Sequence, residues 1–183
     1  LTGAATVGNA TSGTAILTQT SGSTGAVTVS DRGTLNASGG TVGAVEAAVD
    51  SSGTAADVNL TGTAVVASLD LNAGAGHVVS NNAEVTGVVT IDNATLTQSG
   101  AGSKLGTDGT TASTVTVGTT GVLDVNGGMV GAIDNSGTTT IDSASATSLT
   151  NTANTSAVNA GGSVTTTTTV TGGTVTVAGG TLT

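Results

Sequence analysis

A nineteen-residue segment that occurs twice constrains the fold of this chain more than any other feature. Residues 27–45 (VTVSDRGTLNASGGTVGAV) align without a gap to residues 115–133 (VTVGTTGVLDVNGGMVGAI), with ten identical positions and an offset of 88 residues. Weaker copies begin at Val89 (VTIDNATLT) and Val175 (VTVAGGTLT). A short β-forming unit copied along a chain is typical of solenoids, in which each repeat stacks on the next.

Strand-forming runs recur every 9 to 12 residues between turns rich in Gly, Asn and Ser. Thr and β-branched residues favour strands, whereas Gly, Asn and Asp favour turns. A loop is expected at residues 99–113, and a strand or tight corner at residues 43–48, which are too few for an isolated helix. The expected strands are 5–7, 15–18, 27–29, 34–36, 41–49, 58–60, 65–71, 78–80, 85–91, 94–97, 114–117, 122–125, 130–133, 138–141 and 147–150, followed by strand-like sequence from Val164.

The repeat offset gives an estimate of the number of coils. If one coil takes about 22 residues, 88 residues make four coils and the chain makes about eight, a rod of roughly 40 Å at the usual strand spacing. We therefore predict an all-β fold in which residues 1–183 form one domain. That domain is a single parallel β-helix (β-solenoid) of about eight coils with Gly/Asn/Ser-rich corners. A β-sandwich pilin joined by strand exchange is the alternative.

The composition favours a thin core. The sequence has no Phe, Trp, Tyr, Pro or Cys, and 36% of its residues are hydrophobic. Aromatic rings dominate the cores of most globular domains, so a thick core cannot be built here. Only 7% of the residues are charged, which is unlike a disordered chain. A narrow solenoid can bury small branched residues in thin layers.

The charge limits the partners that this chain can have. The net charge is −9, and the only cations are Arg32 and Lys104. Nucleic-acid surfaces need clustered Lys and Arg, so nucleic acid is excluded as a partner. Anionic membranes are disfavoured, and no run of about 18 apolar residues predicts membrane insertion. The chain begins with Leu1 rather than Met, as after removal of a signal segment, and we expect an extracellular or cell-surface location.

No group of residues predicts catalysis. Glycosidases need two carboxylates about 5 to 10 Å apart, but lyases and hydrolases on β-helices would also use cations and aromatic sugar platforms, which this chain lacks. His77 is the only histidine and there is no cysteine, so no transition-metal set and no G-x-S-x-G triad motif exist. We expect no enzyme activity and assign no catalytic, cofactor-binding or metal-binding residue. The acids are Asp31, Glu46, Asp50, Asp57, Asp70, Glu84, Asp92, Asp108, Asp124, Asp134 and Asp142.

Calcium is the one cofactor that the acids suggest, in a structural role. Gly106-Thr107-Asp108-Gly109 is a faint match to the calcium-binding β-roll nonapeptide, and it does not repeat in tandem. The glycine pairs lack the G-x-x-x-x-G-K-[ST] pattern of a phosphate loop and are expected to form corners. These pairs are Gly39-Gly40, Gly127-Gly128, Gly161-Gly162, Gly172-Gly173 and Gly179-Gly180.

Alternating threonines suggest a second kind of surface. Threonines at i and i+2 of a strand lie about 6.6 Å apart on one face, the geometry that ice-binding solenoids use. Thr is also an ordinary solvent-facing strand residue. The alternating sets are Thr114/Thr116, Thr165/Thr167/Thr169, Thr174/Thr176 and Thr181/Thr183.

Three phrases carry a resemblance to known exoproteins. VTGGTVTVAGGTLT, GVLDVNGGMV and DRGTLNASGGTV resemble the passenger repeats of bacterial autotransporter adhesins and filamentous-haemagglutinin-like proteins. The likeness is one of repeat style and covers most of the chain. It implies a secreted parallel β-helix displayed on, or released from, a cell. Thr/Gly/Ala-rich chains without aromatics are also typical of surface-layer and matrix filament subunits.

The expected function is therefore structural. No capping helix is evident at either terminus, so we expect self-association, head-to-tail or lateral, into a filament or cell-surface layer. The alternative is a surface adhesin that contacts a host or neighbouring cell, although it lacks the aromatic hot spots of binding surfaces. Ice binding ranks third.

Overall fold

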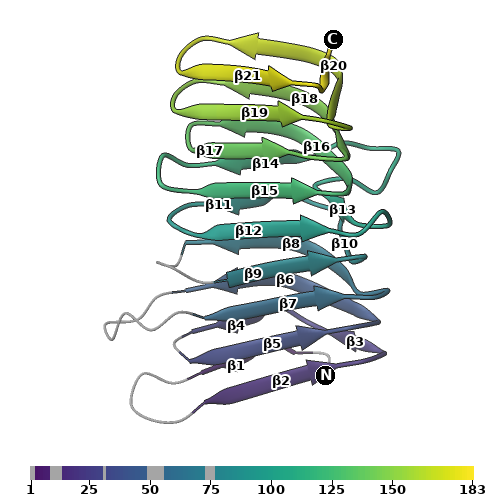
Figure 1. Ribbon diagram of the computed structural model, residues 1–183. Coiled ribbons are helices and arrows are strands. Elements are labelled where there is room, and N and C mark those ends of the chain that lie inside the picture. Colours follow the sequence, from purple (N-terminus) through teal and green to yellow (C-terminus); the bar gives the residue numbers. More distant parts are fainter. Residues whose placement is uncertain (1–2, 9–13, 31, 49–55, 73–76) are drawn as a thin grey trace.

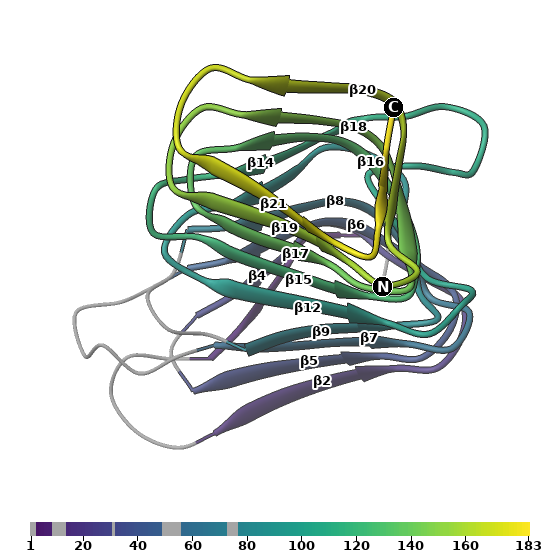
Figure 2. The same ribbon diagram turned by 45° about the horizontal axis from the view of Figure 1, so that its top comes forward.

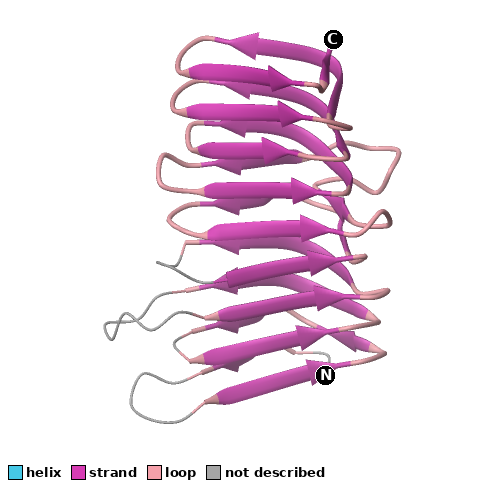
Figure 3. Ribbon diagram, viewed as in Figure 1, coloured by secondary structure: helices cyan, strands magenta, loops and turns pink. Residues whose placement is uncertain are grey.

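The computed structural model describes residues 3–8, 14–30, 32–48, 56–72 and 77–183, and these residues form strands and turns with no helix. Their strands form two sheets, and all strand pairs within the sheets are parallel. The two sheets stack the coils into a rod whose termini lie at opposite ends (Figures 1 and 3). The predicted all-β parallel solenoid is confirmed.

The nine-stranded sheet contributes one strand to each coil. Nine successive strands make eight steps from coil to coil, as the sequence predicted. The strands are β2 (Ala15–Gln19), β5 (Gly33–Ala37), β7 (Asp57–Thr61), β9 (His77–Asn81), β12 (Thr95–Ser99), β15 (Val122–Asn126), β17 (Thr138–Ile141), β19 (Thr155–Asn159) and β21 (Thr174–Ala178).

The thirteen-stranded sheet forms the rest of each coil (Figure 2). A bend divides this sheet into two halves, which we call its arms. In several coils each arm is a separate strand, as in β10 and β11, and in others one long strand spans both arms. Its strands are β1 (Ala5–Val7), β3 (Ser23–Thr24), β4 (Val27–Val29), β6 (Thr41–Ala47), β8 (Val65–Leu71), β10 (Glu84–Val85), β11 (Val89–Ile91), β13 (Lys104–Leu105), β14 (Thr114–Val117), β16 (Gly128–Asn135), β18 (Ala144–Asn151), β20 (Ser163–Val170) and β22 (Thr181–Leu182).

The strand register explains the offset of 88 residues. Val27 pairs with Val45, which pairs with Leu69, then Val89 and then Val115. The two copies of the repeat therefore lie four coils apart, as predicted. Val27 also lies directly beneath Val45, and Val115 beneath Ile133. The duplicated unit is thus one complete coil, whose last residue lies directly above its first.

The core is a thin column of aliphatic side chains between the sheets. Leu35 and Leu123, conserved between the two copies of the repeat, are fully buried, and Val27 and Val115 face them from the other sheet at 1% and 0% exposure. Burying one such side chain contributes about 1.5–3 kcal/mol. Because every coil adds a layer of this kind, the chain forms a core without aromatic residues.

A buried polar column replaces aliphatic residues in the later coils. Asn135 and Asn151 pair in register and are fully buried. The Asn135 amide donates to Asn151 Oδ1 (2.7 Å), and the hydroxyl groups of Thr139 and Ser156 donate to the Oδ1 atoms of Asn135 (3.0 Å) and Asn151 (2.7 Å). Burial without such partners would cost several kcal/mol, so the four side chains are tolerated inside because they satisfy one another.

The shared Gly-Gly-x-Val-Gly-Ala block places its last glycine at the bend of the thirteen-stranded sheet. A Cβ on Gly131 would overlap the backbone oxygens of Gly106 and Ser113, and a Cβ on Gly43 would lie 2.8 Å from the Gly25 carbonyl carbon. Neighbouring coils approach so closely at this bend that only a hydrogen atom fits. The repeated glycine is therefore a consequence of stacking.

Most expected strands are present, with four corrections. The two-residue strand β3 was not predicted. The run 85–91 is two strands, β10 and β11, because the chain bends between them at Gly87. The expected loop 99–113 contains the short strand β13. Strand β19 was not predicted, because its inward residue Ser156 breaks the hydrophobic alternation and is held by Asn151 instead.

Candidate functional site

A loop at residues 106–113 projects from the thirteen-stranded sheet between β13 and β14. The equivalent bend between β3 and β4 takes only two residues. The loop is closed by an antiparallel bridge between Thr107 and Ala112, and the Ser113 amide donates to the Gly106 carbonyl (2.7 Å). It is an ordered protrusion from an otherwise regular surface.

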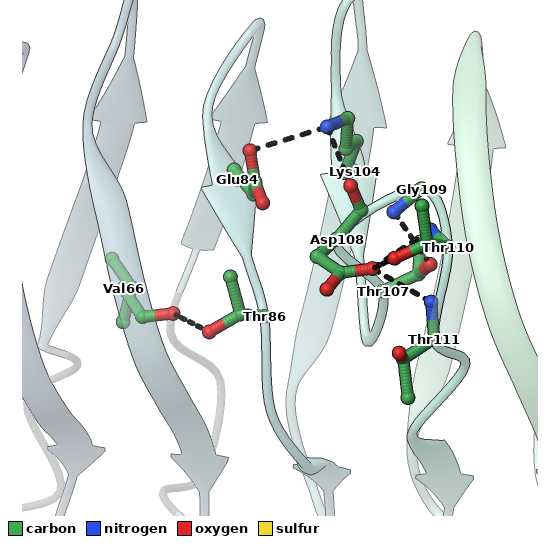
Figure 4. Close-up of polar contacts among 9 residues, drawn as sticks. All are labelled: Val66, Glu84, Thr86, Lys104, Thr107, Asp108, Gly109, Thr110 and Thr111. Carbon is green, nitrogen blue, oxygen red and sulfur yellow. Dashed lines mark hydrogen bonds and ion pairs between the residues drawn. The ribbon is translucent and has the colours of Figure 1, made fainter.

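Asp108 organises the tip of this loop (Figure 4). Its Oδ1 accepts hydrogen bonds from the Thr111 amide, the Thr110 hydroxyl and the Thr110 amide, each at 2.7 Å. The Thr111 amide, then the Thr110 groups, lower the pKa of Asp108 to about 2. The carboxylate that suggested calcium therefore serves to fold its own turn. Within the described ranges, no three His, Cys, Asp or Glu side chains gather in a way that could hold a metal ion.

Lys104 joins the loop to the coil below. Its Nζ donates to the Asp108 carbonyl oxygen (2.8 Å) and forms an ion pair with Glu84 Oε2 (3.4 Å). Lys104 and Glu84 are paired residues of β13 and β10, so the stacking of the coils itself brings the two charges together. Both side chains are about 30% exposed, at 32% and 26%.

A hollow of about 280 Å³ lies beside this ion pair, at the corner between the two sheets. It spans three successive coils, and glycines at two of them leave the corner without side chains. The residues that line it are Gly62, Thr63, Ala64, Val65, Asn82, Glu84, Gly102 and Lys104.

Asn82 fixes the middle of the hollow. It adopts a left-handed backbone conformation (φ 58°), which Asn tolerates better than most residues. The backbone amide of Asn82 donates to Ser103 Oγ (2.7 Å), and its side-chain Oδ1 accepts a hydrogen bond from the Gly102 backbone amide (3.2 Å). Its side-chain NH₂ group has no partner among the described residues. The same is true of Glu84 Oε1, so the hollow contains polar atoms that are free to meet a ligand.

The other acidic residues named in the sequence analysis do not form a common site. Glu46 and Asp70 are neighbours in register on the outer face of β6 and β8. Asp124 accepts a hydrogen bond from Asn126 (3.1 Å), and Asp142 one from Asn159 (3.3 Å). Asp31 and Asp50 lie outside the described residues. His77 is in β9, and its side chain is outside the described part of the chain.

The glycine pairs lie at corners, as predicted. Gly40 and Gly128 have φ values of +78° and +81°. Each lies above a glutamine. A Cβ on Gly40 would be 3.0 Å from Gln19 Nε2, and a Cβ on Gly128 would be 3.1 Å from Gln98 Nε2.

Sequence reasoning missed these two glutamines. Gln19 Nε2 donates to the Thr41 carbonyl (2.9 Å), and Gln98 Nε2 donates to the equivalent Met129 carbonyl (3.2 Å). A signal was present, since Leu-Thr-Gln occurs at 17–19 and again at 96–98 and holds the only glutamines of the chain. The Glu84–Lys104 pair had no such signal, because its spacing depends on coil lengths that the sequence does not reveal.

The alternating threonines are divided between two surfaces. Thr114 and Thr116 belong to the thirteen-stranded sheet, whereas Thr174 and Thr176 belong to the nine-stranded sheet. The longest file in register on the nine-stranded sheet joins Thr138, Thr155 and Thr174. Ice binding thus stays a prediction. The array of aligned threonines is smaller than one Thr pair in every coil would give.

Comparison of the chain with protein-family models, curated proteins and solved structures finds no match. In the described ranges there is no helix of the length and apolar character needed to cross a membrane.

Proposed function

We propose that this chain is an extracellular structural protein that self-associates into a filament or a cell-surface layer. The observation that carries the proposal is the parallel ladder, in which main-chain hydrogen bonds of the same kind join each coil to the next, with a register shift between β18 and β20. Within the described structure, β2 pairs only with β5 and β21 only with β19. A strand that pairs on one side can add another strand on its free side.

The chemistry of the C-terminal end of the stack supports association through the part of β20 that β22 leaves uncovered, since β22 pairs only with Ser163 and Val164, and through β21. Val170 and Val177 are 52% and 45% exposed, although the equivalent positions whose burial is described in other coils are buried. The Thr168 hydroxyl is buried without a hydrogen-bond partner in the described structure. A further coil from a second copy would cover the valines and offer the hydroxyl a partner. The resemblance to passenger and filament-type exoproteins supports the proposed extracellular location.

Electron microscopy and fibre diffraction of the purified 183-residue chain test this function. Head-to-tail stacking predicts filaments with a repeat of about 4.8 Å along the long axis. Val177→Lys should abolish such filaments, because it places a charge on the exposed edge. Thr138→Lys, on the outer face of β17, is the matched control and should interfere only with lateral association. A monodisperse monomer at high protein concentration would contradict the proposal.

A second candidate function is adhesion to a cell surface. The observation that favours it is the ordered loop 106–113 beside the polar hollow, since binding residues are often carried on loops held by a rigid scaffold. Binding of the labelled chain to bacterial and host cells, compared with its binding to a glycan array, tests this candidate. Absence of binding in both assays would exclude it.

A further inference from the structure

We propose that the hollow at the Glu84–Lys104 pair binds one neutral sugar ring. This inference names the ligand class of the second candidate function and rests on that candidate. It does not depend on self-association. The size of the hollow, its charge and its free polar atoms all point to this ligand.

The size of the hollow limits the ligand to a small molecule. Its volume of about 280 Å³ is just below the range of about 300–1,000 Å³ that drug-sized ligands occupy. Gly102 puts no side chain on the wall of this space, and the nearest neighbours of a Cβ there would be atoms of the Asn82 side chain, at 3.4 Å or more. A single ring fits a site of this volume.

The charge of the hollow favours a neutral ligand. Glu84 and Lys104 lie 3.4 Å apart and compensate each other. An anion would meet the Glu84 carboxylate and the net charge of −9, and a cation would compete with Lys104 for the same carboxylate. A neutral molecule leaves the ion pair intact and does not have to displace either partner.

The free polar atoms match the hydroxyl groups of a sugar. Glu84 Oε1 can accept a hydrogen bond, and the Asn82 NH₂ group can donate one. Lys104 has three N–H donors, of which two have partners. Adjacent hydroxyls each donate and accept, so they fit acceptors and donors placed side by side. Val65 adds an apolar surface for the C–H groups of the ring. Without an aromatic platform, the affinity should be weak, with a Kd of the order of 1 mM.

NMR titration of the full chain with methyl hexopyranosides tests the proposal. We expect saturation transfer to the sugar and amide shifts confined to the lining residues, such as Gly102 and Lys104. Glu84→Gln should weaken binding about tenfold, because it removes a charge-assisted hydrogen bond. The variant should fold, since an exposed ion pair contributes only about 0–1 kcal/mol. Thr63→Val, which removes a lining hydroxyl while keeping the shape, is a second site variant.

Matched controls separate this site from other binding. Glu46→Gln makes the same change on the opposite arm of the thirteen-stranded sheet and should leave the titration unchanged. Methyl glucuronate and phosphate report any preference for anions. The proposal is overturned if no sugar causes shifts up to about 100 mM, far above a millimolar Kd, if Glu84→Gln leaves the Kd unchanged, or if only the anions bind. Cell binding that persists in Glu84→Gln would keep adhesion while rejecting this site.

Discussion

Gln19 and Gln98 take the same corner position in coils that are four steps apart. The register passes from Gln19 through Ala37, Leu60 and Ser80 to Gln98. In each case the side-chain amide binds a carbonyl of the coil above, beneath a glycine with positive φ. A side chain thus supplies a contact between coils where the strands are interrupted by the corner.

Gln98→Met should lower the free energy of unfolding by about 1 kcal/mol in urea denaturation. Two hydrogen bonds, to Gly127 and Met129, are lost at about 1 kcal/mol each. Part of this cost is offset, because Gln98 Oε1 is buried without a partner in the described structure and disappears with the substitution. Leu123→Ala, a cavity-forming reference in the same sheet, should cost about 2–5 kcal/mol. A variant more stable than the parent would show that the unpartnered oxygen is the larger effect.

Asp108 predicts a pH dependence confined to loop 106–113. Its folded pKa of about 2 is below the ordinary Asp value of 3.8, so the charged form is favoured by folding of the loop. The stabilisation is complete above pH 3.8 and is lost as the pH falls towards 2. The protection of the Thr110 and Thr111 amides, measured relative to their intrinsic exchange rates at each pH, should therefore fall over this interval. Asp108→Asn should remove this pH dependence, and unchanged protection in the parent would contradict the assignment.

Among the structural elements, the bend of the thirteen-stranded sheet has the strictest steric requirement. Gly131→Ala should destabilise the fold by several kcal/mol, because its Cβ would meet backbone atoms of the coil below that cannot rotate away. Gly102→Ala is the matched control, since its Cβ would make only ordinary contact at 3.4 Å, and its effect should be small. Thermal unfolding followed by circular dichroism compares the two, and equal melting temperatures would refute the steric argument.

Strand positions were predictable from the sequence because alternation and turn residues are local signals. Val27-Thr28-Val29 and Thr114–Val117 were located correctly for this reason. Strand β19 was missed because the hydroxyl of buried Ser156 accepts a hydrogen bond from the side-chain amide of Asn135 (3.0 Å), 21 residues away, which no local pattern encodes. The same limit applies to the break between β10 and β11, which is set by stacking on the coil below.

The candidate site could not be predicted for a different reason. Glu84 and Lys104 are 20 residues apart, and Gly62 is a further coil away, so the hollow exists only once the lengths of three coils are known. Coil lengths vary because insertions such as 106–113 occur at some bends and not at others. A loop was expected over residues 99–113, of which 106–113 is loop while residues 104–105 form β13. The relation of loop 106–113 to the hollow was not expected.

For the whole molecule, loop 106–113 should be dispensable for folding. Deleting residues 107–112 joins Gly106 to Ser113 and leaves a two-residue bend, like the one between β3 and β4. The loop ends already meet, since the Ser113 amide bonds to the Gly106 carbonyl. The deletion variant should keep its β circular dichroism, and its free energy of unfolding should change by about 1 kcal/mol or less. Loss of cooperative unfolding would show that the loop supports the stack.

The four-coil offset also has a genetic consequence. A deletion between the two copies of the repeat, which removes residues 28–115 and joins Val27 to Thr116, excises 88 residues and four whole coils. Ile133 would then lie above Val27 as it now lies above Val115. Unequal crossing-over within the gene could therefore shorten or lengthen the rod in four-coil steps while every remaining strand stays in register. Such length variants would lose or gain the hollow as a unit, because residues 62–104 lie entirely between the two crossover points.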